Sequence, residues 1–184
     1  MDFVQSIKQA FKVVELNDHA IRKVAKDQSA TWPAIIIVIV ASFCGAFGSI
    51  LFPIKYGPVI YRPTFLEAVG HAIVAVFLFL IIVYLLHLVA NHLFQARGDY
   101  LSLLRVIGHG YIIGVLSLLP VLSILVLIWG LVLLVRILKD VKRLKAEQAI
   151  IAVVLVGMVI FVFLAIFQDL NADNLYGALY LVPH

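Results

Sequence analysis

Long apolar runs alternate with short charged segments along this chain. The clearest runs are 33–54, 69–94 and 149–167, and none of them holds an Asp, Glu, Lys or Arg. Because an α-helix rises about 1.5 Å per residue, about 20 apolar residues cross a hydrocarbon core of about 30 Å. The pattern therefore predicts three membrane-spanning helices at these positions.

The apolar run from 101 to 138 is too long for one span. A single helix of this length would be roughly twice as long as the hydrocarbon core is thick. Its one strong helix breaker, Pro120, lies close to the centre. We interpret the region as a helical hairpin with spans at 101–118 and 121–138, in preference to one steeply tilted helix. The predicted fold class is an all-α integral membrane protein, a bundle of five transmembrane helices.

Composition agrees with this fold class, and charge predicts the orientation. Hydrophobic residues make up 64% of the 184 residues and charged residues 13%, whereas soluble domains average about 45–50% and about 25%. With five spans, one side of the membrane receives every Lys and Arg except Lys55 and Arg62. Because cytoplasmic loops carry the excess of basic residues, we predict that the N-terminus is cytoplasmic and the C-terminus outside.

These expectations divide the chain into a cytoplasmic amphipathic and basic segment at 1–32, a transmembrane domain at 33–168 and a short external tail at 169–184. In the first segment, apolar residues share one helical face and polar residues the other: Phe3, Ile7, Ala10, Phe11 and Val14 against Gln5, Lys8, Gln9 and Lys12. This pattern is typical of a helix on the inner membrane surface with its lysines toward anionic headgroups. A solvated tail with a basic face would have the same pattern. A second short helix is expected after a cap at Asn17 and Asp18.

The acidic residues and the motifs argue against catalysis. No predicted span holds a carboxylate in its interior, although proton-coupled transporters usually carry one there. Motifs of hydrolases, zinc proteases and nucleotide-binding loops are absent from the sequence. Cys44, the single cysteine, lies in an apolar run and is interpreted as a small packing residue. We therefore predict a non-enzymatic protein with no catalytic residue, metal site or cofactor. Topology accounts for the basic segments, so we expect no nucleic-acid partner.

Polar side chains in the second, third and fourth spans are expected at a similar depth near the cytoplasmic surface. They are Tyr84, His87, Asn91, Arg105, His109, Tyr111 and Arg136. Three interpretations stay open for this polar layer. It forms interhelical hydrogen bonds with arginines that reach the surface, or it binds an anionic lipid or small ligand. The third is a metal site, for which two histidines without a third ligand are weak support.

Small residues recur at a spacing of four on two predicted helices. Ala41, Gly45 and Ser49 form one ridge, and Gly110 and Gly114 form another. Because small side chains let helix backbones approach closely, both ridges predict tight helix packing, either within one chain or between protomers.

Three segments together resemble the Yip family, named for Ypt/Rab-interacting proteins. They are "SATWPA" before the first span, "HLFQARGDYLSLLRVIGHGYIIGVLSLLP" around the third and "LIWGLVLLVRILKDVKRLKAEQA" from the fourth onward. The resemblance covers about residues 15–168, and the five-span topology agrees with it. In eukaryotic members it implies an association with Rab-type GTPases and with vesicle traffic between endoplasmic reticulum and Golgi. Those members carry a long cytoplasmic N-terminal region and an Asp-Leu-Tyr-Gly-Pro motif near the first span.

This chain departs from the eukaryotic pattern at its N-terminal region. Its first predicted span begins at 33, and Tyr56-Gly57-Pro58, the nearest match to the motif, follows that span. The chain is similar to compact prokaryotic members, so the resemblance implies the inner membrane of a prokaryotic cell. The endoplasmic reticulum or Golgi membrane is the alternative, and no Rab-type GTPase partner is expected.

Two functions are compatible with these features. The first is a non-enzymatic membrane-organising or scaffold protein that contacts the lipid bilayer, including anionic lipid, and partner helices of a homo-oligomer or another membrane protein. The alternative is a small channel or transporter for an anion or small solute that uses the polar layer. A cavity that passes Arg105 and His109 would favour transport, whereas a closed bundle with lateral grooves would favour the scaffold.

Overall fold

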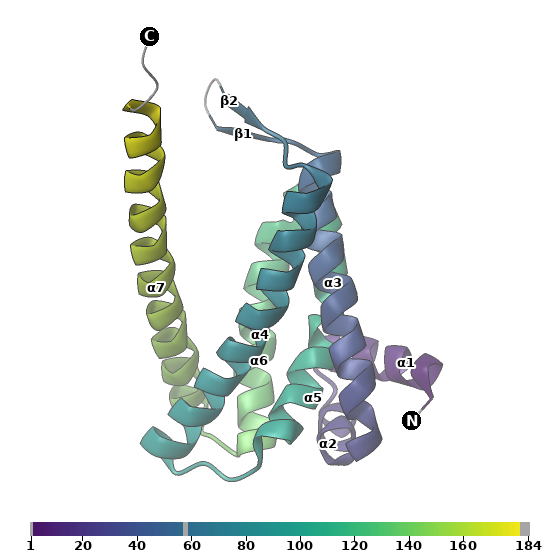
Figure 1. Cartoon of the computed structure of the whole chain (residues 1–184). Helices are drawn as coiled ribbons and strands as arrows, with labels where there is room; N and C mark the ends of the chain where they lie inside the picture. The colour runs from purple at the N-terminus through teal and green to yellow at the C-terminus, as the bar shows by residue number, and fades with distance from the viewer. Residues whose placement is uncertain (1, 57–58, 181–184) are drawn as a thin grey trace.

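In the described part of the chain, the computed structural model contains five helices that are long and apolar enough to cross a membrane (Figure 1). The structure describes the backbone of residues 2–56 and 59–180 and the side chains of residues 2–53 and 62–166. Four of the candidate spans contain α3 (Thr31–Leu51), α4 (Phe65–Phe94), α6 (Ser123–Lys142) and α7 (Ala146–Tyr180). The remaining span, Tyr100–Leu118, begins with the 11-residue helix α5 (Tyr100–Gly110). The predicted all-α fold with five spans is confirmed, and the side on which each terminus lies stays a prediction.

The third span changes its helix type halfway. α5 ends at Gly110, and the chain continues as the 3₁₀ helix η2 (Tyr111–Leu118) and, after Leu119, as η3 (Pro120–Leu122). The second half of the predicted helix at 101–118 is therefore not α-helical. Glycine disfavours an α-helix, and both Gly110 and Gly114 lie at this change. Because a 3₁₀ helix rises about 2.0 Å per residue, η2 reaches the turn at Pro120 with few residues.

A short β-hairpin joins α3 to α4, between the first two predicted spans. Its strands, β1 (Ile54–Tyr56) and β2 (Val59–Tyr61), are antiparallel. α4 then begins before the predicted start at 69, because Thr64 and Glu67 form a capping box at its N-terminus. α7 continues past the predicted end of the last span at 167, into the predicted tail. The end of that tail, 181–184, lies outside the described residues, as do Gly57 and Pro58 of the Tyr-Gly-Pro match.

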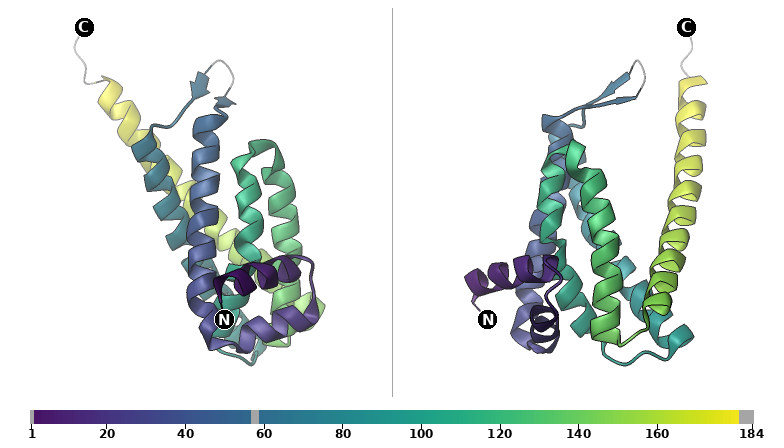
Figure 2. Two further views of the ribbon diagram at one scale, coloured as in Figure 1. Left: turned by 90° about the vertical axis from the view of Figure 1, so that its right-hand side faces the viewer. Right: turned by 180° about the vertical axis from the view of Figure 1, so that it is seen from behind.

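The N-terminal helices lie across the bundle axis near one of its ends (Figure 2). They are α1 (Phe3–Val14), α2 (Asp18–Lys26) and the short 3₁₀ helix η1 (Gln28–Ala30). The strip of α1 that packs on the bundle consists of Ser6, Ala10 and Val13, all buried. Phe3 and Phe11, from the predicted apolar face, are 43% and 57% exposed. One edge of that face therefore contacts the bundle, and the other edge stays free.

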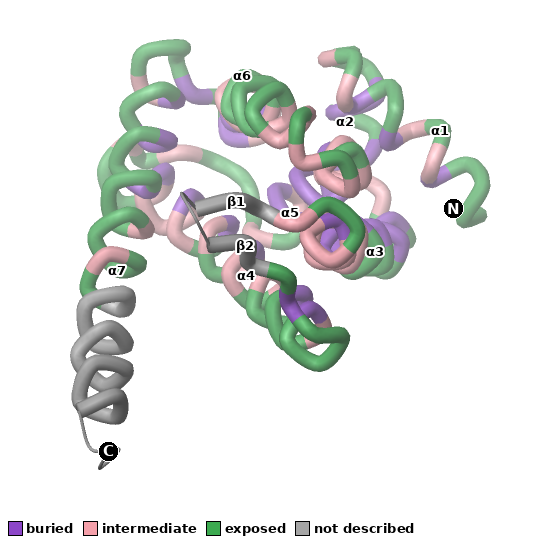
Figure 3. The backbone as a smooth tube through the Cα atoms, turned by 90° about the horizontal axis from the view of Figure 1, so that it is seen from above, coloured by how far each residue is buried: buried purple, intermediate pink, exposed green. Residues whose placement is uncertain are grey.

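The two ends of the bundle differ in charge and in how far α7 lies from the other helices. We call the end that carries α2 and the loops 95–99 and 143–145 the basic end. The opposite end carries the β-hairpin (Figure 1). α7 contacts α4 and α6 near the basic end and leans away from the other helices toward the opposite end (Figures 1 and 2). Viewed along the bundle axis, α7 lies on the side opposite α1 (Figure 3).

Candidate functional site

Small residues hold α3 tightly against α5 and η2. An ideal Cβ placed on Gly108 would lie 2.9 Å from Ala34 Cβ, and one on Gly114 would lie 3.3 Å from Ala41 Cβ. At Gly48 a Cβ would lie only 2.7 Å from the carbonyl oxygen of Leu118. We call this contact line the α3–α5 seam. Backbones this close leave no room for a side chain, so the seam closes one side of the bundle.

The structure places the predicted ridge residues in different environments. Ala41, Gly45 and Gly114 lie in the α3–α5 seam, with Gly45 against Ser117. Ser49 donates to the carbonyl of Ala46 in its own helix, and Gly110 faces Leu133 of α6 and Val13 of α1. Gly48 and Gly108 also belong to the seam and were not among the predicted ridge residues. A spacing of seven between Ala34, Ala41 and Gly48 was the signal that could have found the seam.

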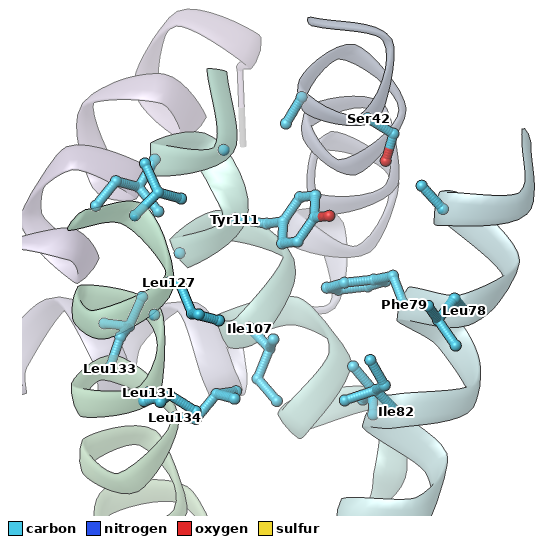
Figure 4. A pocket seen from close by; sticks show the side chains of 18 of the residues that line it. Ser42, Leu78, Phe79, Ile82, Ile107, Tyr111, Leu127, Leu131, Leu133 and Leu134 are labelled. Atoms are coloured by element: carbon cyan, nitrogen blue, oxygen red, sulfur yellow. The ribbon is translucent and has the colours of Figure 1, made fainter. Parts of the chain in front are cut away.

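The predicted polar layer does not form as one layer, because its members belong to separate clusters. Tyr84 is 51% exposed, and its ring lies edge-on to Tyr100 with centroids 6.0 Å apart. Tyr111 lies edge-on to Phe79 at 4.9 Å, and its hydroxyl points toward Ser42 (Figure 4). Neither tyrosine contacts the charged residues of the predicted layer.

Arg105 is buried beneath the N-terminal helices. Its Nε donates to Thr31 Oγ1 at 2.9 Å, and its Nη1 donates to the carbonyl of Ala25 at 2.8 Å. That carbonyl belongs to the last turn of α2, where backbone acceptors have no partner within the helix. Only 6% of Arg105 is exposed. The guanidinium therefore caps α2 and does not reach the membrane surface as expected.

His109 connects α5 to α1. Its Nδ1 lies 2.8 Å from the carbonyl oxygen of Arg105, and its Nε2 lies 2.8 Å from Ser6 Oγ. A carbonyl only accepts, so Nδ1 carries a proton, and in the neutral ring Nε2 accepts from the Ser6 hydroxyl. Trp129 of α6 adds a second link, since its indole Nε1 donates to Val14 O at the end of α1. Both contacts position α1 on the bundle.

A second cluster joins α4, α6 and the loop 95–99. Lys142 Nζ lies 2.7 Å from His87 Nδ1, 3.1 Å from Asn91 Oδ1 and 2.6 Å from Gly98 O. Asn91 Nδ2 lies 3.1 Å from His87 Nε2. Lys142 is fully buried. Lys142 lies in a basic run of the sequence, and nothing in that run indicates that it is the partner of His87 and Asn91.

Donors and acceptors in this cluster balance when Lys142 is neutral. Gly98 O and Asn91 Oδ1 accept from Nζ, so Asn91 Nδ2 donates to His87 Nε2. His87 Nδ1 then carries the ring proton and donates to the lone pair of the amine. A charged lysine would leave two donors facing each other, and exchanging the amide atoms of Asn91 would only move that conflict to Nζ. In this arrangement each contact of the cluster joins one donor to one acceptor.

Ion pairs hold α2 against α6. Arg136 pairs with Asp140 one turn later, at 3.0 Å, and with Asp18 of α2. Arg22 of α2 lies 3.8 Å from Asp140. The hydrogen bond from Arg136 holds the pKa of the Asp18 carboxyl below its ordinary value of 3.8. The pairing of Arg136 with Asp140 expected from their spacing is present, and Asp18 extends it to the N-terminal segment.

An apolar cavity of about 610 Å³ lies between α3, α4, η2, α6 and α7 (Figure 4). Leu78, Phe79 and Ile82 of α4 face Leu127, Leu131 and Leu134 of α6 across it (Figure 4). Its few polar lining residues are Ser42, His71, Tyr111 and Ser117, and no charged residue lines it within the described part of the chain. A Cβ on Gly130 or Gly157 would meet no atom within 4 Å. The bundle is therefore loosely packed between α4, α6 and α7, and the cavity there reaches Ala41, Gly45 and Gly114 of the α3–α5 seam.

Within the same described residues, no three His, Cys, Asp or Glu side chains come together as a metal site. A comparison with protein families gives a match to the Yip1 domain over residues 15–167. The chain belongs to the Yip1 domain family. The resemblance found in the sequence is thus confirmed at the level of the family, and the compact prokaryotic subtype stays a prediction. No curated protein and no solved structure gives a significant match.

The Yip1 match covers the membrane bundle and also the part of the N-terminal segment that follows α1. It begins at Glu15, the residue after α1, and reaches Phe167 in α7. The match therefore includes α2 and the residues that hold it, such as Arg105 and Arg136. α1 and its contacts to His109 and Trp129 lie largely outside the Yip1 domain match.

Proposed function

We propose that this Yip1-domain protein is a non-enzymatic membrane-organising or scaffold protein, which holds lipid chains or partner helices in the apolar cavity between α4, α6 and α7. The main support for this proposal is the cavity itself, because none of its described lining residues is charged. Its volume of about 610 Å³ falls within the range of about 300–1,000 Å³ that is usual for ligand pockets. In a bilayer, a lateral apolar opening of this size is filled by acyl chains or by another helix.

The polar clusters support this function over anion transport. Arg105 and His109 do not line the cavity, and both are bonded to the N-terminal helices. Arg136 pairs with two carboxylates, and Lys142 is buried against His87, Asn91 and the carbonyl of Gly98. No cation of the predicted layer is thus directed toward a solute path, which the channel or transporter alternative would need.

The closed seam gives the proposed scaffold a rigid side. α3, α5 and η2 meet through glycines and alanines, where dispersion contacts are dense and a shift of either helix is opposed by backbone atoms. The opposite side, formed by α4, α6 and α7, leaves space between bulky side chains. A lipid or helix that enters this space fills a gap without separating the closed side.

The test is native mass spectrometry of the detergent-extracted protein, with a variant in which the cavity is filled. Gly130→Leu with Gly157→Leu places two bulky side chains where open space exists. We expect this variant to retain several-fold less co-purified lipid or partner protein than the unchanged chain. Gly70→Leu is the matched control, because Gly70 also has free space around it but does not line the cavity. Equal retention by all three proteins contradicts the proposal.

Liposome flux separates the scaffold from the transporter. The reconstituted protein is expected to pass chloride or iodide no faster than empty liposomes do. Flux that rises with protein and falls in the cavity-filled variant would support the alternative function instead.

We further propose that the basic end faces the cytoplasm of a prokaryotic cell and that the hairpin end faces outward. The supporting observation is the excess of Lys and Arg on one side of the bundle. Single cysteines at Gln5 and Arg62, in a Cys44→Ala background, test this with a membrane-impermeant maleimide on intact cells. Labelling of the Arg62→Cys protein alone is expected, and labelling of the Gln5→Cys protein alone would reverse the orientation.

A further inference from the structure

α1 and α2 enclose a shallow basic cleft on the surface of the basic end. Lys8 and Lys12 of α1 and Lys23 of α2 line it, together with Glu15 and Phe11. α1 and α2 pack against each other and run side by side across the bundle (Figure 2). Two helices that are separate in the sequence thus bring three ammonium groups to one opening.

The charges of these lysines are not compensated within the protein. In the described part of the chain, Lys8, Lys12 and Lys23 form no ion pair and no hydrogen bond with a side chain, and Glu15 is the one carboxylate that lines the cleft. The neighbouring basic residues differ in this respect, since Arg22 pairs with Asp140 and Arg136 pairs with Asp18. The cleft therefore offers an excess of positive charge to an external anion.

Apolar side chains stand beside the lysines on the same helix. Phe11 is 57% exposed, Phe3 43% and Val4 60%, although the buried strip of α1 is packed on the bundle. A helix with free aromatic residues on one edge and lysines on the next has the form of an interfacial membrane helix. A small soluble anion would make no use of the aromatic edge, whereas a lipid would contact both edges.

α1 and α2 contact α6 at two different depths. Trp129, which donates to the last carbonyl of α1, lies near the middle of the predicted fourth span at 121–138, whereas Arg136, which pairs with Asp18 of α2, lies near the basic end of that span. Val13 lies against Gly110, and Arg105 and Arg136 lie further toward the basic end. The cleft between α1 and α2 therefore lies between the middle of α6 and its basic end, and α2 forms the side nearer that end.

We infer that the cleft binds the headgroup of an anionic phospholipid, with the phosphate between Lys8, Lys12 and Lys23 and the acyl chains along Phe3, Val4 and Phe11. This inference rests on the proposed function for the membrane position of the chain and deepens it by naming the class of lipid and the site. Lys8 and Lys12 of the site precede the Yip1 domain match, whereas Lys23 lies within it. Each lysine near an anionic lipid surface contributes about fivefold in binding.

The experiment compares two triple variants in detergent with equimolar phosphatidylglycerol and phosphatidylcholine of identical acyl chains, with bound lipids counted by native mass spectrometry. The cleft variant is Lys8→Gln, Lys12→Gln and Lys23→Gln. The control variant, Lys26→Gln, Lys139→Gln and Lys145→Gln, removes the same charge from the same end of the bundle outside the cleft. Circular dichroism and size-exclusion chromatography establish that both variants keep the helical fold.

We expect the unchanged chain and the control variant to prefer phosphatidylglycerol, and the cleft variant to lose at least about tenfold of that preference. If both variants lose the preference for phosphatidylglycerol equally, the lipid is attracted by the overall positive charge of the basic end. If the cleft variant keeps its preference, the lipid binds at another site. Either result overturns the inference. Displacement of phosphatidylglycerol by millimolar inorganic phosphate would also overturn it, in favour of a free anion. Lipid retained in the cavity is measured with the Gly130 and Gly157 variant, so the proposed function is tested separately.

Discussion

The two sides of this bundle are both built from apolar, membrane-spanning segments, and they pack in opposite ways. Along the α3–α5 seam, a Cβ on Gly48 or Gly108 would lie within 3.0 Å of atoms on the facing segment. On the α4, α6 and α7 side, glycines such as Gly130 face open space, and leucines line a cavity of about 610 Å³. Lipid tails are as apolar as leucine, so apolar composition cannot select helix partners in a membrane. Small residues in register decide which side closes.

The largest expected effect comes from a methyl group in the seam. Gly48→Ala places a Cβ against the carbonyl oxygens of Leu118 and Ser117, at 2.7 and 2.8 Å, and backbone atoms cannot rotate away. We expect it to lower the free energy of unfolding by about 1–3 kcal/mol, although alanine favours a helix over glycine. Unfolding in mixed micelles with increasing dodecyl sulfate, followed by circular dichroism, measures the change.

Gly130→Ala is the matched control on the open side. Its new methyl group meets no atom within 4 Å, so helix propensity is the main effect, and stability should stay constant or rise by up to about 1 kcal/mol. If the two substitutions change stability equally, the difference between the closed and the open side has no energetic basis.

A smaller effect is expected from Arg105, which attaches the N-terminal helices to the closed side. Arg105→Leu leaves Ala25 O and Thr31 Oγ1 without their donor and should weaken the attachment of α2 by about 2 kcal/mol. Limited proteolysis within 1–30 should become faster, while lipid retained by the cavity stays unchanged. Arg97→Leu, at an exposed loop position, is the control. Loss of cavity lipid in the Arg105 variant would show that the two sides are not independent.

The smallest effect is expected from pH at Asp18. Because Arg136 lowers the pKa of this carboxyl below 3.8, its contribution to the attachment of α2 is complete above about pH 4 and is lost as the pH falls through the lowered pKa. Amide hydrogen exchange in α2 should therefore differ between the unchanged chain and Asp18→Asn at pH 5–8, and the difference should shrink as the pH falls through the lowered pKa of Asp18. A difference that persists in acid would mean that Asp18 acts through another contact than Arg136.

Hydropathy and turn chemistry were sufficient to predict much of this fold. Long uncharged runs predict the helices α3, α4, α6 and α7, and Pro120 predicts the turn of the helical hairpin between the third and fourth spans. The cap at Asn17, whose side chain accepts from the Ala20 amide, is also a local feature. These properties depend on residues within a few turns of one another, and the membrane core requires a helix wherever a run is long and apolar.

The candidate site was predicted less completely, because its contacts join distant residues. The sequence predicted His87, Asn91, Arg105 and His109 as important polar positions, and it placed them together in one layer. The structure pairs His109 with Ser6 and His87 with Lys142 instead. Nothing in the local pattern around either histidine indicates which distant side chain meets it, since spacing along one helix defines a face and not the element that covers it.

The sequence by itself determined that this chain has five spans, an amphipathic N-terminal helix and the features of the Yip1 domain. Only the tertiary structure decided that α1 and α2 cover Arg105 and His109, that η2 is a 3₁₀ helix and that one side of the bundle encloses a cavity. The physical reason is that the free energy of transferring a segment into a membrane is a sum over its own residues, so membrane spans can be predicted from the local sequence. Packing depends on the shapes of two surfaces that the fold alone brings together.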